Sequence, residues 1–88
     1  MNENQERFGR QQNIDLINDH HQWGGSLILP VVRREGRKSI SGVILKRESS
    51  RVYLINIWEI ADPTSMEAFP SVKFGSVEAM VDDGWEVD

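Results

Sequence analysis

The sequence predicts an α+β fold: an antiparallel three- to four-stranded β-meander with a short C-terminal helix packed on one face. Segments 26–34, 39–47 and 51–60 are rich in the β-branched and aromatic residues that favour strands. The connections between them are short, and sequential strands with short connections pair most simply as an antiparallel meander. After them, Ser76 is placed to cap a short helix that Gly84 ends in the left-handed conformation.

The length of 88 residues predicts one domain, with residues 14–88 forming a single small α+β domain. Residues 1–13 are almost entirely polar, so they have no apolar face whose burial would offset the entropy cost of ordering. We therefore predict a disordered N-terminal tail over residues 1–13. A short helix capped by Asn13 is expected next, and the glycine pair 24–25 ends it. Its apolar side is formed by Ile14, Ile17 and Trp23.

Three residues shape the first two strands. Pro30 has no N–H to donate to a ladder, so the strand over 26–34 is predicted at an edge of the sheet. Gly36 supplies the positive φ that a hairpin loop needs between the first and second strands. Gly42, inside the second strand, indicates either a bulge or a close approach of another part of the chain. Residues 48–50 are expected to turn the chain into the third strand.

The third predicted strand, 51–60, is apolar on both faces, because successive side chains of a strand point to opposite sides. The closing helix can cover one face through Val77, Met80 and Val81, and Phe69, Phe74 and Trp85 can help. The second face has the N-terminal segment, with Ile14, Leu16, Ile17 and Trp23, or else a second copy of the chain. We therefore predict a homodimer buried through the sheet, with an interface that includes Tyr53, Ile55 and Ile57.

The closing section contains two helix signals. Asp62 followed by Pro63 is a helix start that Pro70 limits to one or two turns. The second helix follows Ser76, and residues 85–87 are suited to a short final strand.

The net charge is −4, and it is unevenly distributed along the chain. Residues 33–51 contain seven basic side chains against Glu35 and Glu48, whereas residues 62–88 contain seven acidic side chains against Lys73. Such polarity serves either a charged partner or the protein itself, with the acidic section folding against the basic one. We rank the second interpretation first.

Motifs of catalysis are missing from the sequence, which therefore predicts a protein that is not an enzyme and has no cofactor. The adjacent His20 and His21 do not share a face of a helix or a strand, and no third histidine completes a zinc site. They are interpreted as two solvated histidines. We therefore predict no catalytic residue and no metal ligand.

A non-enzymatic protein–protein interaction or assembly module is the predicted function. Arginine and tryptophan are the residue types most often energetic at interfaces, so the predicted partner-binding residues are Arg33, Arg34, Arg37, Trp23 and Trp58. The alternative is a small nucleic-acid-binding sheet module that uses the basic hairpin loops. It ranks lower because the loops at the two ends of a strand lie on the order of 20–25 Å apart. With no cysteine and no apolar run of about 20 residues, the chain is expected in the cytoplasm and not in a membrane.

Overall fold

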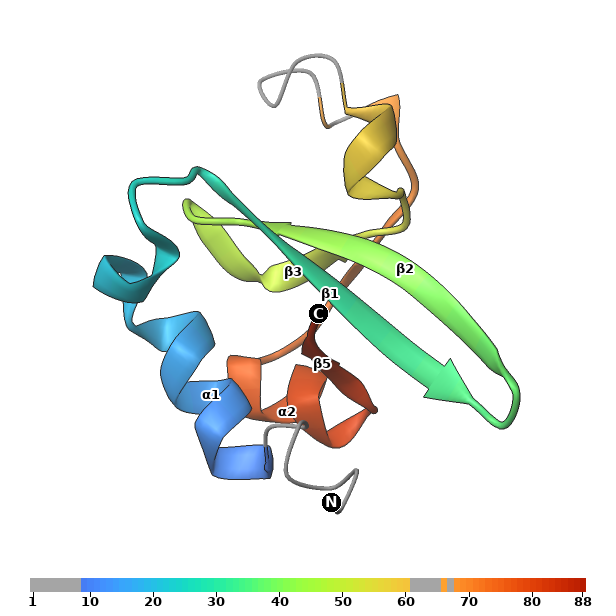
Figure 1. Ribbon diagram of the computed structural model, residues 1–88, viewed down its shortest axis with the longest axis horizontal. Helices are drawn as coiled ribbons and strands as arrows, with labels where there is room; N and C mark the ends of the chain where they lie inside the picture. Colours follow the sequence, from blue (N-terminus) through green and yellow to red (C-terminus); the bar gives the residue numbers. More distant parts are fainter. Residues whose placement is uncertain (1–8, 61–65, 67) are drawn as a thin grey trace, which may run out of the picture.

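A five-stranded antiparallel sheet in the order β4-β3-β2-β1-β5 forms the centre of the computed structural model, which describes residues 9–60, 66 and 68–88 (Figure 1). The predicted α+β fold class is confirmed, with strands β1 (Ile28–Glu35), β2 (Lys38–Leu45), β3 (Glu48–Tyr53), β4 (Ser71–Lys73) and β5 (Trp85–Val87). The helices are α1 (Arg10–Asn18) and α2 (Val77–Asp82), with short 3-10 helices η2 (His20–Trp23) and η3 (Ile57–Glu59).

The edges of the sheet are formed by the two shortest strands, β4 and β5, of three residues each. The prediction that Pro30 marks an edge strand is wrong, because β1 pairs with β2 on one side and with β5 on the other. The nitrogen and carbonyl of a strand residue point to the same side. The Pro30 carbonyl accepts a bond of 3.1 Å from Asp88 N, so the proline nitrogen faces the very end of β5, where no donor is needed.

The third strand is shorter than predicted and shifted towards the N-terminus. Residues 48–50 belong to β3, and the chain turns instead at residues 46–47. Beyond Tyr53 the strand ends, because Ile55 N donates to Tyr53 O at 2.9 Å and bends the chain away from β2. The prediction of a strand over 51–60 is therefore wrong after Tyr53, and η3 occupies part of that segment.

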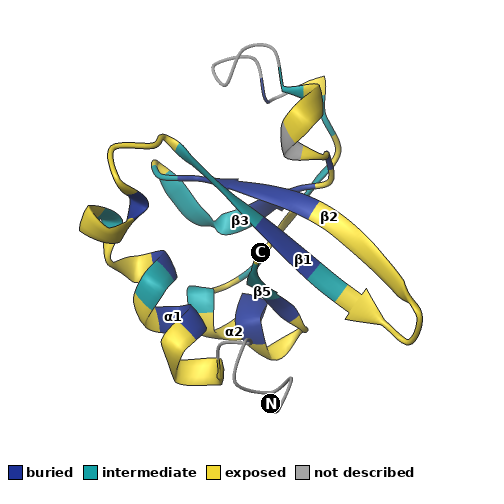
Figure 2. Ribbon diagram, in the orientation of Figure 1, coloured by how far each residue is buried: buried dark blue, intermediate teal, exposed yellow. Residues whose placement is uncertain are grey.

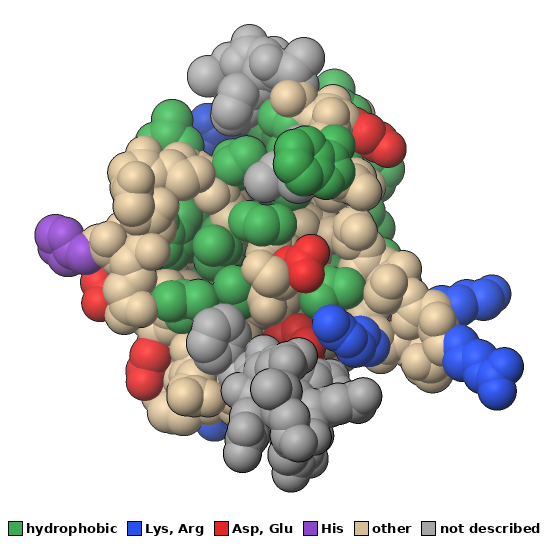
Figure 3. Space-filling view, viewed as in Figure 1, with side chains coloured by type: hydrophobic (Ala, Val, Ile, Leu, Met, Phe, Trp, Pro, Cys, Tyr) green, Lys and Arg blue, Asp and Glu red, His purple; other side chains and the backbone are tan. Residues whose placement is uncertain are grey.

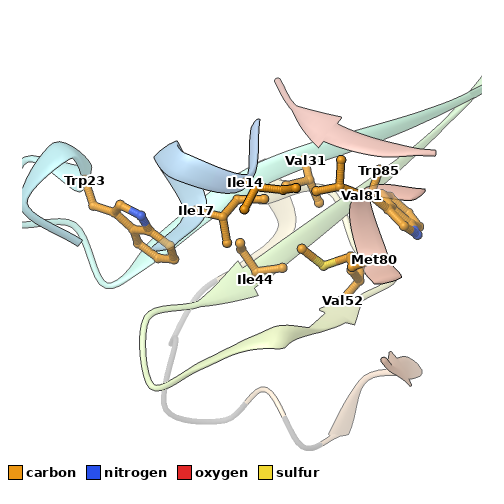
Figure 4. Packing of buried hydrophobic residues seen from close by; sticks show 9 residues of the cluster. All are labelled: Ile14, Ile17, Trp23, Val31, Ile44, Val52, Met80, Val81 and Trp85. Atoms are coloured by element: carbon orange, nitrogen blue, oxygen red, sulfur yellow. The ribbon is translucent and has the colours of Figure 1, made fainter. Parts of the chain in front are cut away.

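One face of the sheet is covered by both helices together (Figure 4). Helices α1 and α2 each contribute two buried side chains, and the indoles of Trp23 and Trp85 close the two ends. The cluster consists of Ile14, Ile17, Trp23, Val31, Ile44, Val52, Met80, Val81 and Trp85. The N-terminal segment thus covers the same face as the closing helix and not, as expected, the opposite one.

The second face of the sheet is covered by the segment that follows β3. The cluster there consists of the buried Val43, Leu45, Tyr53, Ile55 and Met66, with Ile28, Ile60 and Phe69 packed against it. Strands β2 and β3 thus bury apolar side chains on both faces of the sheet, and one copy of the chain provides both covers. An uncovered second face is no longer an argument for a homodimer.

Helix α1 begins at Arg10, inside the segment 1–13 that was predicted as a disordered tail. Its N-cap is Gly9, so the prediction that Asn13 caps this helix is wrong. The Asn13 side chain instead donates to Gly9 O at 3.0 Å and accepts from Val87 N at 2.8 Å, which ties α1 to β5. Residues 1–8, and the predicted helix start at Asp62 and Pro63, lie outside the described residues.

Several local predictions are confirmed. Ser76 caps α2, since its hydroxyl accepts from Ala79 N at 3.0 Å, and Gly84 follows with φ 114°. Gly36 has φ 62° in the turn between β1 and β2. Gly42 is a site of close approach, because a Cβ there would meet Val52 and Trp85. The register irregularity of β2 lies further along, between Ile44 and Leu45.

Candidate functional site

The distal half of the β1–β2 hairpin, residues 34–41, is here named the basic arm. Strand pairing is regular to its end, where Glu35 lies opposite Lys38. All residues of the arm are exposed, on both faces of the ribbon (Figure 2). Lysine and arginine side chains project from its tip, away from the rest of the molecule (Figure 3).

The arm is unusual because its strands are ordered although they bury little. Fixing the backbone of a residue costs about 1–2 kcal/mol of conformational entropy, and an isolated two-stranded hairpin is at best marginally stable in water. Strand β5 pairs with β1 only from Val31 to Arg33. The arm, which begins at residue 34, therefore has no pairing with β5. A partner surface that packs against such a hairpin would stabilise it by burying its exposed side chains.

The base of the arm is neutralised by the acidic C-terminal section. Arg33 Nε donates to Asp83 O at 2.8 Å and lies 3.5 Å from Asp83 Oδ2. Arg33 also pairs with Glu35, and Arg34 Nη1 lies 3.0 Å from Glu86 Oε1. The expectation that the acidic section folds against the basic one is confirmed for the Arg33–Asp83 and Arg34–Glu86 pairs.

The same pattern recurs away from the arm, where Arg10 Nε lies 2.5 Å from Asp82 Oδ1. The Arg10 side chain bonds to Asp82 and holds the pKa of that carboxyl below its usual value. At the tip of the arm, in contrast, Arg37 and Lys38 make no ion pair with any described residue. Of the three predicted partner-binding arginines, Arg37 is thus the one that offers its charge to the solvent.

The tryptophans divide into two groups. Trp23 and Trp85 are buried, with 5% and 4% exposure, and Trp23 Nε1 donates to Leu16 O at 3.1 Å. Trp23 therefore stabilises the core, and almost none of its surface is available for the predicted contact with a partner. Trp58, on η3, is 89% exposed. Trp58 falls within the strand predicted over 51–60. Because β3 ends at Tyr53, Trp58 lies beyond the sheet instead.

Two of the three residues predicted for a dimer interface are buried within the subunit. Tyr53 and Ile55 are each 5% exposed and belong to the second-face cluster, so little of either is available to a partner. The Ile57 side chain lies outside the described parts. The edges of the sheet also disfavour strand addition, because β4 and β5 are very short and β4 has Pro70 before it and Lys73 within it.

The two histidines differ in their surroundings. His20 Nε2 lies 3.1 Å from Ser49 Oγ, and its ring packs edge-on against Trp23 with centroids 5.1 Å apart. His21 is exposed, so the interpretation of both as solvated holds for His21 alone. The carboxylate oxygens of Asp19 accept from His21 N and Gln22 Nε2. The Gln22 bond lowers the pKa of Asp19.

Within the described parts of the chain, no group of three His, Asp or Glu side chains is placed to hold a metal ion. No helix of those parts has the length and apolar character needed to cross a bilayer. No protein-family model matches the chain, and no curated protein or solved structure matches it either.

Proposed function

We propose that the chain is a non-enzymatic protein-interaction module whose basic arm binds an acidic surface on a partner protein. The observation that carries the proposal is the exposure of residues 34–41 on both faces of an ordered ribbon. A partner packed on this ribbon would offset its ordering entropy and would match its charge. Arg37 and Lys38 at the tip are the residues that would meet the partner's carboxylates. A cytoplasmic location is part of the same proposal.

An acidic protein surface suits the arm better than a nucleic acid does. The arm has three basic side chains and one acidic one, which is a small positive patch on a chain of net charge −4. The other basic group, Lys46 and Arg47, lies at the opposite end of β2, on the order of 20–25 Å away. The two groups do not form the continuous track along which nucleic-acid binders neutralise successive phosphates.

Charge reversal at the tip tests the proposal. The full chain and its variants are immobilised and exposed to an extract of the native host, in parallel with and without nuclease treatment. We expect wild type and the control K46E, at the far end of β2, to retain the same stoichiometric partner, and the double variant R37E/K38E to lose it. Circular dichroism should show all three folded, because every substituted side chain lies outside the two core clusters. Retention of the partner by R37E/K38E would contradict the proposal, and retention that nuclease abolishes would favour nucleic acid.

Self-association is a second candidate function, favoured by Trp58 specifically. A tryptophan that is 89% exposed offers a large apolar area, and tryptophan is among the residues most often energetic at interfaces. Sedimentation equilibrium at high micromolar concentration should then show a dimer for wild type and for the control Leu27→Ala. Leu27 is another exposed apolar residue, with 62% exposure, in the loop before β1. Trp58→Ala should be monomeric, and a monomeric wild type would contradict self-association.

A further inference from the structure

A second polar site, distinct from the arm, opens beside the start of β3. A cavity of about 370 Å³ is lined by Arg47, Glu48, Arg51, Tyr53 and Ser71. Strand pairing brings these residues together, because β4 lies beside β3 with Ser71 opposite Tyr53, and Arg51 is two positions before Tyr53 on the same face. The turn at 46–47 adds Arg47 to the lining.

The hydroxyl of Tyr53 is a group on this cavity that has no hydrogen-bond partner among the described residues. The residue is 5% exposed, and a tyrosine buried to this degree normally finds a hydrogen-bond partner for its hydroxyl. No hydrogen bond joins this hydroxyl to a described residue, and no buried side-chain nitrogen or oxygen among those residues lacks a partner, so the hydroxyl reaches the cavity. A donor held in this way favours a ligand that brings an acceptor atom.

The charges around the cavity indicate the sign of that ligand. Arg51 Nε lies 3.0 Å from Glu48 Oε1, and Arg51 Nη1 donates to Ser71 Oγ at 2.9 Å. Lys73 Nζ lies 3.1 Å from Glu48 Oε2 and donates to Ser50 Oγ at 3.0 Å. These contacts use two of the five N–H donors of the Arg51 guanidinium. The carboxylate of Glu48 is matched by two cations, and its bonds to Lys73 and Arg51 keep its pKa low.

Arg51 and Lys73 together outweigh the single carboxylate of Glu48 by one positive charge. A phosphate monoester carries about 1.5 to 2 negative charges at neutral pH and presents three strong acceptor oxygens. Arginine recognises such oxygens with paired N–H donors. The cavity also exceeds the volume of a lone phosphate and lies within the range of about 300–1,000 Å³ that is typical of small-molecule sites.

We propose that this cavity binds the phosphate group of a small phosphate monoester. The Tyr53 hydroxyl and the remaining N–H groups of Arg51 donate to the phosphate oxygens. Glu48 holds Arg51 and Lys73 in place but weakens the affinity, because its carboxylate repels the ligand. The proposed site does not depend on the role of the arm.

The test is a titration of the full chain, followed by ¹H–¹⁵N NMR, with phenyl phosphate, inorganic phosphate and acetate as probes. We expect saturable shifts at residues 47–53 and 71 with phenyl phosphate, weaker binding of inorganic phosphate and still weaker binding of acetate. Tyr53→Phe keeps the ring and removes the donor, so it should weaken phenyl phosphate binding about tenfold. Glu48→Gln should strengthen that binding severalfold.

The matched control is Arg37→Gln, which removes one positive charge from the tip of the arm and should leave phenyl phosphate binding unchanged. Three results would overturn the proposal: shifts that do not saturate, acetate binding as tight as phenyl phosphate binding, or equal weakening by Tyr53→Phe and Arg37→Gln. Glu48→Gln leaves the Tyr53 side chain intact, so an unchanged affinity in that variant would also count against the site as described.

Discussion

Gly42 and Trp85 approach so closely that a Cβ atom on Gly42 would lie 2.9 Å from Trp85 Cζ3. The same Cβ would lie 2.6 Å from Cγ1 of Val52, so the space above Gly42 is filled from two sides. Trp85 is 4% exposed and belongs to β5, which has three residues and pairs with β1 alone. The indole that lies over the backbone of β2 therefore fixes the short edge strand to the rest of the sheet.

Replacing Gly42 by alanine should destabilise the protein, because the new methyl group displaces Val52 or Trp85 from a filled core. We expect the free energy of unfolding to fall by about 1–3 kcal/mol, the usual cost of overpacking, in urea denaturation. The matched control is Gly75→Ala, since no atom lies within 4 Å of a Cβ at Gly75 and its φ is outside the positive region. Equal losses in the two variants would contradict the close-packing argument.

Asn13 is a buried polar residue that joins α1 to β5. It is 3% exposed, and its side chain accepts from Val87 N at 2.8 Å. Asn13→Ala leaves the Val87 N–H without this acceptor in a partly buried position, which costs about 1–3 kcal/mol. We expect a loss of this size in thermal and urea unfolding, together with faster hydrogen exchange at the Val87 amide.

Asn18→Ala is the control for this prediction. Asn18 is at the other end of α1 and is exposed, so its substitution should change the free energy of unfolding by less than about 0.5 kcal/mol. If Asn13→Ala were as mild as Asn18→Ala, the link between α1 and β5 would contribute nothing measurable.

Elements defined by local chemistry could be predicted from the sequence. Helix α2 needs a cap and a stop, and Ser76 and Gly84 supply both within a few residues of it. The β1–β2 turn needs a residue with positive φ, which Gly36 provides. In each case the information lies in the residues that adopt the structure.

Elements defined by distant contacts could not be predicted. The apolar run after Tyr53 looks like a strand, but the chain bends there and Leu54 N donates to Pro70 O at 2.9 Å. Of the described residues that follow the bend, Ile55, Ile60, Met66 and Phe69 pack on the second face of the sheet. The prediction that the third strand has two apolar faces holds for Val52 and Tyr53, which are buried on opposite faces, but the sequence does not say which segment covers each face.

The candidate sites follow the same division. The basic residues of the arm are visible in the sequence as a cluster around Gly36, although their exposure on both faces depends on where β5 ends. The cavity beside Tyr53 depends on the pairing of β3 with β4, and β4 is a strand of three residues with no recognisable pattern. Its residues are therefore brought together by the fold and not by any motif.

The cap of α2 provides a further test. Ser76→Ala removes the acceptor of the Ala79 N–H bond and should lower the free energy of unfolding by about 1 kcal/mol. The control is Ser39→Ala, which removes a hydroxyl from an exposed serine on the arm. Comparing the free energies of unfolding of the two variants by chemical denaturation separates the effect of the cap from that of losing a hydroxyl. Ser76→Asp, which also caps, should restore most of the loss. A Ser76→Asp variant as unstable as Ser76→Ala would argue against the cap.

Glu48 predicts a dependence of stability on pH. Its bond to Lys73 and, after that, its bond to Arg51 lower its pKa in the folded state. A carboxyl with a lowered folded pKa stabilises the fold above its unfolded pKa, and that contribution is lost as the pH falls through the folded value. Because the side chain is 36% exposed, solvent screening limits the contribution to less than about 1 kcal/mol.

Wild type should therefore have a higher Tm than Glu48→Gln at neutral pH, and the difference should vanish once the pH is below the lowered pKa of Glu48. Thermal melts of both proteins from neutral to acidic pH provide the measurement. Glu59→Gln serves as the control, because Glu59 is exposed and forms no ion pair with a described residue, so its melting curve should follow wild type throughout. A gap between wild type and Glu48→Gln that persists in acid would show that the two ion pairs of Glu48 are not its source.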